Sequence, residues 1–166
     1  VRLRPDRAEF RLNRAAIRAA RGDLDGAIAD WNRSGVDAPS VLLDLAAAWH
    51  TKHHAYEAER LLTRVLRIEP ANARARYLLG GVRHGWGDRA GAIEQYTLAL
   101  RAVPGMAEAA GDRGVARHAL GELEGAVADY SLALHIHPRL PRIRANRGLA
   151  KLRLGDRSGA IEDYRR

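Results

Sequence analysis

The chain has 166 residues, 46% of them hydrophobic and 29% charged, so it holds enough apolar side chain for one domain or a short array of repeats. Lysine and arginine outnumber aspartate and glutamate by 28 to 20, a net charge of +8, so partners carrying acidic groups or phosphates must be considered. The lack of cysteine excludes a disulfide framework, a thiolate zinc site and a cysteine nucleophile, and no apolar run approaches the ~18 residues of a membrane span.

A pattern of small and large side chains recurs along the chain. Alanines in similar surroundings stand 31, 34, 34 and 34 residues apart, at Ala27, Ala58, Ala92, Ala126 and Ala160. Twelve residues before them are the small residues Ala15, Ala46, Gly80, Gly114 and Gly148. Four residues after them are the large residues Trp31, Leu62, Tyr96, Tyr130 and Tyr164. Spacing this regular indicates that each unit is a copy of one supersecondary element.

In chain order, the pattern predicts a single array of about four and a half repeats. Its segments are the tail of a preceding repeat (1–7), four repeats (8–38, 39–72, 73–106 and 107–140) and a truncated fifth repeat (141–166). The chain begins without methionine and stops within an expected helix, so we interpret it as a segment of a longer array. Without a polar capping helix, the last repeat is expected to fray or to bury its open face, which makes self-association a further expectation.

The junction between the first and second repeats is three residues short. Because every other interval in that stretch is kept, the deletion is assigned to the segment between Pro39 and Ala46. Ser40 is then predicted to cap the following helix. Two interpretations stay open: a tolerated loop deletion, and a change of superhelical curvature that reshapes the binding surface.

Two helices are expected in each repeat. In the fourth, a first helix over 109–120 ends at Gly121, and apolar residues at three- or four-residue steps predict a second helix over 123–135. Pro138 prevents its continuation. Acids at the turn are predicted to cap the second helices, namely Asp23, Asp88, Glu122 and Asp156.

This pattern resembles the tetratricopeptide repeat, a helix-turn-helix family of 34 residues. The stretches 120–130 and 154–164 carry the resemblance best, and it extends over the whole chain. Departures include His53, which replaces the turn glycine, and Leu62, which replaces the aromatic residue. The resemblance implies an all-α, right-handed superhelix, or solenoid, of stacked helix pairs that binds partner proteins.

The arginines form two ladders along the repeats. Arginine and aspartate occur together, 16 residues apart, in Arg14 and Asp30, Arg113 and Asp129, and Arg147 and Asp163. Where leucine replaces the arginine, at Leu45 and Leu79, the acid is also replaced, by Leu61 and Gln95. This covariation predicts an ion pair between the two helices of a repeat. The second ladder (Arg18, Arg83, Arg117 and Lys151) is either internally paired or a basic stripe for nucleic acid or another polyanion.

By the resemblance, one face of the first helices lines a concave groove. The candidate residues for binding a partner are Asn13, His50, Arg74, Tyr77, His84, His118, Arg142 and Asn146. Val115, Leu149 and Arg153 share that face. Asn13 and Asn146 are expected to bind peptide amides, and Arg74 and Arg142 to attract acidic side chains. A clamp for chaperone C-termini, known in some relatives, needs Lys and Asn where this chain has Leu12 and Ala16, so that ligand is not expected.

The histidines allow two further hypotheses. His50, His84 and His118 stand 34 residues apart, and their protonation near pH 6 is a candidate switch, with polar residues near helix ends as the alternative. His50, His53 and His54 have a spacing that can bind a metal, but a surface turn is the favoured interpretation.

No motif of a nucleophile, a phosphate-binding loop or a metalloprotease occurs, so we expect no enzymatic activity, no cofactor and no metal. The predicted function is a protein-protein interaction scaffold that binds a partner peptide or helix in the groove. The alternative is electrostatic binding of nucleic acid or another polyanion through an arginine-rich face.

Overall fold

The computed structural model describes residues 5–51 and 54–165. Every regular element within these residues is an α-helix, which confirms the predicted all-α fold. The chain divides into two compact units, residues 1–82 and 83–166, whose boundary falls inside helix α5. Most of the predicted tail of a preceding repeat, and His53, lie outside the described residues.

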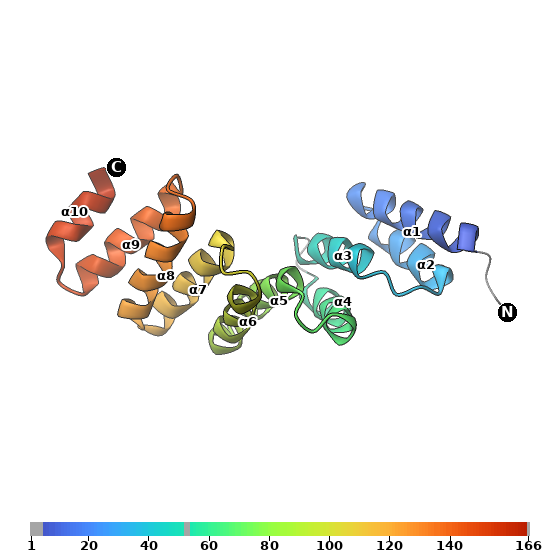
Figure 1. The fold of residues 1–166 in the computed structure, drawn as a ribbon, viewed down its shortest axis with the longest axis horizontal. Helices are drawn as coiled ribbons and strands as arrows, with labels where there is room; N and C mark the ends of the chain where they lie inside the picture. The colour runs from blue at the N-terminus through green and yellow to red at the C-terminus, as the bar shows by residue number, and fades with distance from the viewer. Residues whose placement is uncertain (1–4, 52–53, 166) are drawn as a thin grey trace. The chain divides into compact units, whose positions relative to one another are not determined.

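The first unit consists of two helix pairs and most of a fifth helix. Its helices are α1 (Pro5–Ala20), α2 (Leu24–Ser34), α3 (Pro39–Thr51), α4 (Ala55–Ile68) and α5 (Ala73–Gly85) as far as Val82. Within the unit α1 packs against α2 and α3, and α3 packs against α4 (Figure 1). The core between them contains the fully buried Leu42, Leu45 and Leu62.

In the second unit, consecutive helices pack in sequence order. They are α6 (Arg89–Ala102), α7 (Ala107–Leu120), α8 (Leu123–Ile136), α9 (Pro141–Arg153) and α10 (Arg157–Arg165). Each packs against the next along the chain from α6 to α10 (Figure 1). Tyr96 and Tyr130 are buried among them, whereas Tyr164 of α10 is 53% exposed.

Small residues let the two helices of a repeat approach each other, as predicted. A Cβ atom on Gly114 of α7 would lie 2.7 Å from Cε1 of Tyr130 on α8. On Gly148 of α9 it would lie 3.1 Å from Cε1 of Tyr164 on α10. The repeating alanines are also buried, so the period seen in the sequence is a period of close helix contacts.

Glycine ends the first helix where the chain turns through a left-handed conformation. The backbone φ is 83° at Gly22, 82° at Gly87, 83° at Gly121 and 87° at Gly155. Residues with a Cβ atom rarely adopt this conformation, and the predicted turn positions are confirmed.

Three of the four acids predicted to cap the second helices do so. The carboxylates of Asp23, Asp88 and Asp156 accept a hydrogen bond from the backbone N–H three residues later, at 3.0, 2.9 and 2.9 Å. The prediction was wrong for Glu122, whose side chain makes no capping bond. Its carboxylate lies 3.6 Å from Arg117 instead.

The short junction removes the last turn of α2, and its predicted place between Pro39 and Ala46 was wrong. Helix α2 has 11 residues where α4, α6 and α8 each have 14. The connection that follows keeps four residues in all these cases. Gly35, with φ 67°, ends α2, and the indole N–H of Trp31 donates to the carbonyl of Val36 at 3.1 Å.

The deletion was assigned to the wrong place because the prolines do not occupy equivalent positions in their repeats. Pro39 begins α3, whereas Pro70 lies in the loop three residues before α5. Proline is suited to both places because neither requires its missing N–H. Ser40 therefore lies inside the first turn of α3 and does not cap it.

Candidate binding groove

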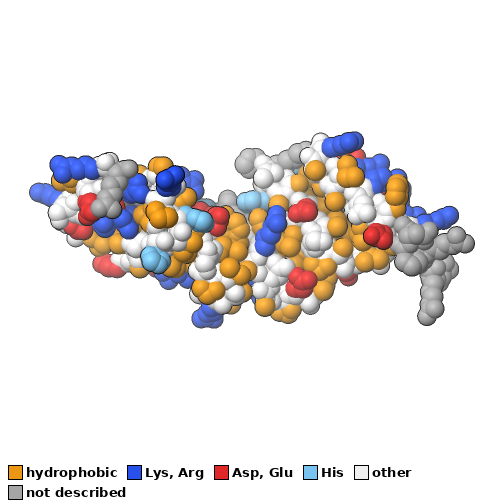
Figure 2. All heavy atoms as spheres, turned by 45° about the horizontal axis from the view of Figure 1, so that its top comes forward, with side chains coloured by type: hydrophobic (Ala, Val, Ile, Leu, Met, Phe, Trp, Pro, Cys, Tyr) orange, Lys and Arg blue, Asp and Glu red, His pale blue; other side chains and the backbone are white. Residues whose placement is uncertain are grey.

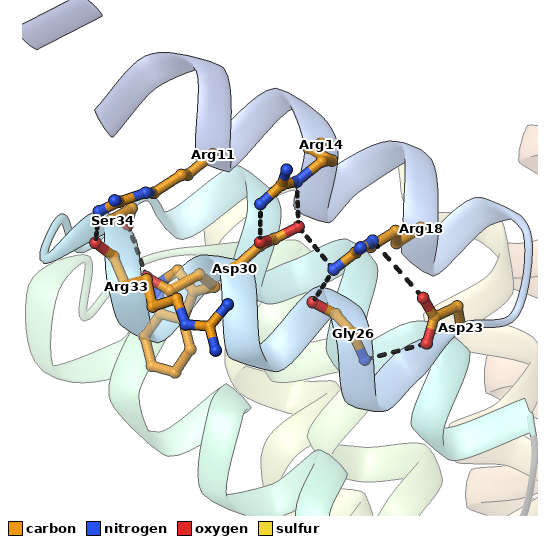
Figure 3. A network of polar contacts seen from close by, with 9 residues as sticks. Arg11, Arg14, Arg18, Asp23, Gly26, Asp30, Arg33 and Ser34 are labelled. Carbon is orange, nitrogen blue, oxygen red and sulfur yellow. Dashed lines mark hydrogen bonds and ion pairs between the residues drawn. The ribbon is translucent and has the colours of Figure 1, made fainter. Parts of the chain in front are cut away.

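The predicted ion pair between the helices of a repeat is present at Asp30 of α2, which is fully buried. Arg14 of α1 donates to it through Nε at 2.6 Å and through a second guanidinium nitrogen. Arg18, one turn later, lies 2.9 Å from the same carboxylate and also donates to the carbonyl of Gly26 (Figure 3). One buried acid thus binds two cations of the preceding helix.

The fourth and fifth repeats contain the same arrangement around buried Asp129 and Asp163. The first cations lie at 3.0 Å (Arg113 Nε to Asp129) and 2.9 Å (Arg147 Nε to Asp163). The second cations lie at 2.9 Å in both cases (Arg117 Nη1 to Asp129, Lys151 Nζ to Asp163). The predicted covariation therefore reflects direct contact, and the second ladder joins it.

This pairing decides between the two interpretations of the second ladder. Arg18, Arg117 and Lys151 bind the buried aspartates, and Arg83 lies 3.6 Å from Asp88 and 4.0 Å from Glu94. The ladder is internally paired, so it is not a free basic stripe. On the face drawn in Figure 2, cationic side chains are scattered among hydrophobic and acidic ones.

The second repeat replaces the ion pair by apolar contact. Leu45 and Leu61 occupy the two positions, and both are buried. Trp49, also buried, takes the place of the second-ladder cation. Its ring contacts that of His54 edge-on, with centroids 4.7 Å apart. The charged and apolar versions occupy the same place between paired helices.

The charges of these clusters stabilise the ionised acids. Hydrogen bonds from Arg14 are the main cause of a lowered pKa at Asp30. Burial raises the pKa of Asp163, but hydrogen bonds from Arg147 and Lys151 outweigh it, and the net shift is downward. Both carboxylates are therefore ionised at neutral pH.

Two of the clustered arginines also contact the preceding helix pair. Arg113 of α7 donates to the hydroxyl of Thr97 on α6 at 3.0 Å. Arg147 of α9 donates to the hydroxyl of Ser131 on α8 at 3.1 Å. The same guanidinium thus joins the helices within one repeat and links that repeat to its neighbour.

The two groove arginines expected to attract acidic ligands already face aspartates. Arg74 of α5 lies 3.6 Å from Asp44 of α3, and Arg142 of α9 lies 3.7 Å from Asp112 of α7. Both pairs link successive first helices at equivalent positions. The arginines are 62% and 78% exposed, so the pairs add little stability, but they balance the charge that an anionic ligand was expected to meet.

The other predicted groove residues are divided between the units. In the first unit Asn13 is exposed on α1, and His50 and Tyr77 are partly buried on α3 and α5. In the second unit His84 is partly buried near the end of α5. Its Nδ1 is shielded from solvent without a hydrogen-bond partner within the described residues.

Two predicted groove residues, His118 and Asn146, lie together in a pocket between α7 and α9. The pocket, called the α7–α9 pocket below, has a volume of about 400 Å³. It is lined by Val115, His118 and Ala119 from α7, Tyr130 from α8, and Asn146, Leu149 and Arg153 from α9.

Tyr130, whose position in the repeat predicts packing, also lines this pocket. Its ring is fully buried, and its hydroxyl has no hydrogen-bond partner within the described residues. Burial, followed by the charge of Asp129, raises its pKa to about 12, so the phenol is a donor at neutral pH. Tyrosine in place of phenylalanine was the signal that could have revealed it.

His118 does not behave as the histidine hypothesis expected. Burial, and then the nearby charge of Arg153, lower the pKa of its imidazole. This shift opposes the protonation near pH 6 that the candidate switch required of His118.

Family profiles match both ends of the chain. One described as "TPR repeat" matches residues 114–155, and one described as "Tetratricopeptide repeat" matches residues 1–40. The chain is a tetratricopeptide repeat (TPR) protein. The matched segments contain the helix pair α7 and α8 in large part, and the pair α1 and α2.

Solved structures of MamA share this TPR fold. One described as "Crystal structure of MamA protein" is 21% identical, with 96% of this chain and 89% of that chain covered and a TM-score of 0.87. MamA 41-end from Desulfovibrio magneticus RS-1 is 21% identical, with 96% and 92% covered and a TM-score of 0.85. A third, "Crystal structure of MamA", is 23% identical, with 89% and 88% covered and a TM-score of 0.82. No curated protein matches this chain in sequence.

The structure also bears on the hypotheses of a metal site and of a membrane-spanning helix. Within 5–51 and 54–165, no three His, Asp or Glu side chains gather in a way that could hold a metal ion. Of the three histidines with metal-binding spacing (His50, His53 and His54), His53 lies outside these ranges. No described helix combines the length and apolar character needed to cross a bilayer.

Proposed function

We propose that this TPR protein is a non-catalytic scaffold that binds a partner peptide or helix in the concave groove, with the α7–α9 pocket as its anchor. The pocket carries the proposal because it combines apolar walls with convergent polar groups from three helices. His118 and Asn146 belong to it, and His84 and Arg142 extend the groove in the second unit. Asn13, His50, Arg74 and Tyr77 are the proposed contacts of the first unit.

Rigid presentation of these groups supports tight recognition of a short segment. Val115 and Leu149 supply apolar contact, while the amide of Asn146 can donate to and accept from a peptide backbone. Both helices that present them are fixed on buried small residues and ion pairs. Binding therefore orders few groups of the scaffold, and the interaction energy is not spent on folding it.

The repeat boundaries remain part of the proposal. We infer repeat units over 8–38, 39–72, 73–106, 107–140 and 141–166. The exposed ring of Tyr164 supports self-association through α10 as a secondary possibility for this chain.

Binding to nucleic acid or another polyanion remains the alternative function. A pocket on α1 lined by Arg7, Phe10, Arg11 and Arg14 favours it, although Arg14 is held by Asp30. A pull-down from source-cell lysate with and without nuclease separates the two. A discrete protein retained after nuclease supports the scaffold, whereas complete loss of bound material supports the alternative.

A peptide display experiment tests the groove. The full chain is used to select binders from a random 12-residue display library, and the selected peptides are measured with the variants Leu149→Asp and Leu132→Asp. Leu149 is 44% exposed in the pocket, and Leu132 is 37% exposed on α8 outside it. We expect Leu149→Asp to weaken binding by about tenfold or more and Leu132→Asp to leave it unchanged. Failure to select any peptide, or equal effects of both variants, contradicts the proposal.

A further inference from the structure

Arg153 is the one charged side chain among the residues that line the α7–α9 pocket, and no Asp or Glu of the described chain lines it. Three other cations of α9 face acids, since Arg142 faces Asp112 and both Arg147 and Lys151 bind Asp163. Arg144 donates to the backbone carbonyl of Pro138. Arg153 forms no ion pair with an acid in the part of the chain that the structure describes. Its charge is close enough to His118 to lower the pKa of that imidazole.

Every polar group around Arg153 can donate a hydrogen bond. The buried phenol of Tyr130 is an unpartnered donor, and Asn146 carries an amide NH₂ group. The neutral imidazole of His118 has one N–H. A pocket with a net positive charge and convergent donors favours a ligand group that carries negative charge and accepts hydrogen bonds.

Apolar walls restrict the kind of anion. Val115, Ala119 and Leu149 surround the polar groups, so a ligand must bring aliphatic surface as well as charge. A volume of about 400 Å³ holds one side chain with its adjoining backbone. Nucleic acid fits poorly, because polyanion binding relies on several phosphate contacts and this pocket offers a single cation.

We propose that the α7–α9 pocket recognises the side-chain carboxylate of a glutamate inside a partner peptide, with Arg153 as the anion-binding residue. The two methylenes of glutamate contact Val115 and Leu149, the carboxylate accepts from Arg153, and Asn146 holds the peptide backbone. This inference rests on the proposed peptide-binding function and specifies its ligand class.

A double-mutant cycle tests the assignment with peptides obtained from the display library. Each selected peptide is synthesised with an amidated C-terminus, as the parent and as a Glu→Gln variant at each glutamate. Both are measured by fluorescence anisotropy with the wild-type chain and with Arg153→Gln. We expect glutamate-containing peptides to be enriched, and one Glu→Gln change to weaken wild-type binding about tenfold. The same Glu→Gln change should have little effect on the affinity of the Arg153→Gln chain for the peptide.

Arg157→Gln is the matched control, because it removes the same charge from an exposed position of α10 outside the pocket. It should bind the parent peptide as the wild type does. Circular dichroism of all variants reports whether they are folded, and rescue of Arg153→Glu by a peptide with lysine in place of the glutamate supports direct contact.

The possible failures are distinguishable. If peptides bind and Leu149→Asp abolishes binding, but glutamine replaces glutamate without loss, the scaffold function stands and the glutamate assignment is overturned. Binding that requires a free C-terminal carboxylate also overturns it, in favour of a terminal anion. If the library gives no binder, both proposals fail.

Discussion

At Asp129 a carboxylate that is 3% exposed lies between Arg113 and Arg117, which are four residues apart on α7. Like charges at this spacing repel, and the shared aspartate converts the repulsion into a three-member cluster. Burial of the acid makes the cluster dependent on all its members, because an unpaired buried charge is costly. Individual residues thus decide whether two helices of a repeat stay together.

Replacing Asp129 tests this dependence. Asp129→Asn should lower the free energy of unfolding by about 3 kcal/mol, because Arg113 loses its partner while only 14% exposed. Urea denaturation followed by circular dichroism measures the change.

The chain supplies the control for that substitution. A combined Arg113→Leu, Arg117→Trp and Asp129→Leu variant copies Leu45, Trp49 and Leu61 of the second repeat, which are buried at the equivalent positions. It should lose less stability than Asp129→Asn. A larger loss would mean that the ion cluster cannot be exchanged for apolar packing.

The lowered pKa values predict acid sensitivity. The stability that Asp30 and Asp163 contribute is complete above their unfolded pKa of about 4 and disappears as the pH falls through their lower folded pKa. The difference in urea midpoint between the wild type and Asp30→Asn should therefore be constant from pH 7 to about 5 and shrink below about pH 4. A difference that stays constant at low pH contradicts this linkage.

His118 gives a separate test of the pH hypothesis. Its lowered pKa predicts that the NMR titration of its imidazole has a midpoint below the ordinary value of 6.5. Because the folded state favours the neutral form, stability should fall as the pH drops from the unfolded pKa of about 6.5 toward that midpoint, and should level off below it. A midpoint above 6.5 would support the hypothesis that protonation of His118 near pH 6 acts as a switch.

On the scale of helices, the most informative element is α2, whose last turn is missing. Gly35 ends it in a left-handed conformation, and Trp31 donates across the turn to Val36. A helix shortened by three residues keeps its buried Ala27 and Asp30 in register with α1 while the next helix begins earlier. The difference in length is thus confined to the end of α2, after its buried Ala27 and Asp30.

Gly35→Ala tests the helix end. We expect a loss of about 1 kcal/mol in unfolding free energy, because an L-residue is disfavoured at φ 67°. Gly105→Ala is the matched control, since Gly105 lies in a loop, has no positive φ, and a Cβ there meets nothing within 4 Å. Thermal unfolding of both variants gives the comparison, and equal melting temperatures would rule out strain at Gly35.

The comparison of sequence with structure is clearest for these elements. The repeat, the turn glycines and the Arg–Asp pairs could be predicted because each rests on a fixed spacing within a helix pair. The end of α2 could not, since Pro39 suits both a loop and a helix start. The capping failure of Glu122 follows from its longer side chain and not from its arginine partner, because Asp88 lies 3.6 Å from Arg83 and still caps its helix.

The candidate site was predicted only in part. The family resemblance placed His118 and Asn146 on the groove face, but it does not report which charges are already compensated. Arg142 was expected to be an anchor and faces Asp112, whereas Arg153 remains without an acid partner in the described residues. The hydroxyl of Tyr130 was overlooked because its position predicts packing.

For the whole molecule, the count of 28 lysines and arginines overstates the number of positive charges that are free to meet a partner. Many cations are engaged within the repeats by buried or facing acids. These cations join helices, and the excess of eight positive charges over the acids is distributed over the rest of the molecule. This distinction bears on any binding of polyanions.

Salt dependence tests that distinction. Arg117→Gln should lower stability, because Arg117 lies 2.9 Å from Asp129. We expect the wild type and this variant to bind a 20-base-pair DNA duplex equally weakly. Fluorescence anisotropy between 50 and 200 mM salt measures the affinity. If the DNA affinity falls steeply with salt in the wild type and less steeply in Arg117→Gln, the second ladder does take part in polyanion binding.

The hydroxyls of Thr97 and Ser131 have a consequence for how such an array evolves. Each receives the same contact from an arginine 16 residues later, so the two junctions use one interchangeable set of atoms. A tandem duplication of residues 107–140 would bring Ser131 to the place that Thr97 now occupies before Arg113. The new junction would form its hydrogen bond at once, without any further mutation. Gene duplication can thus lengthen this protein one repeat at a time.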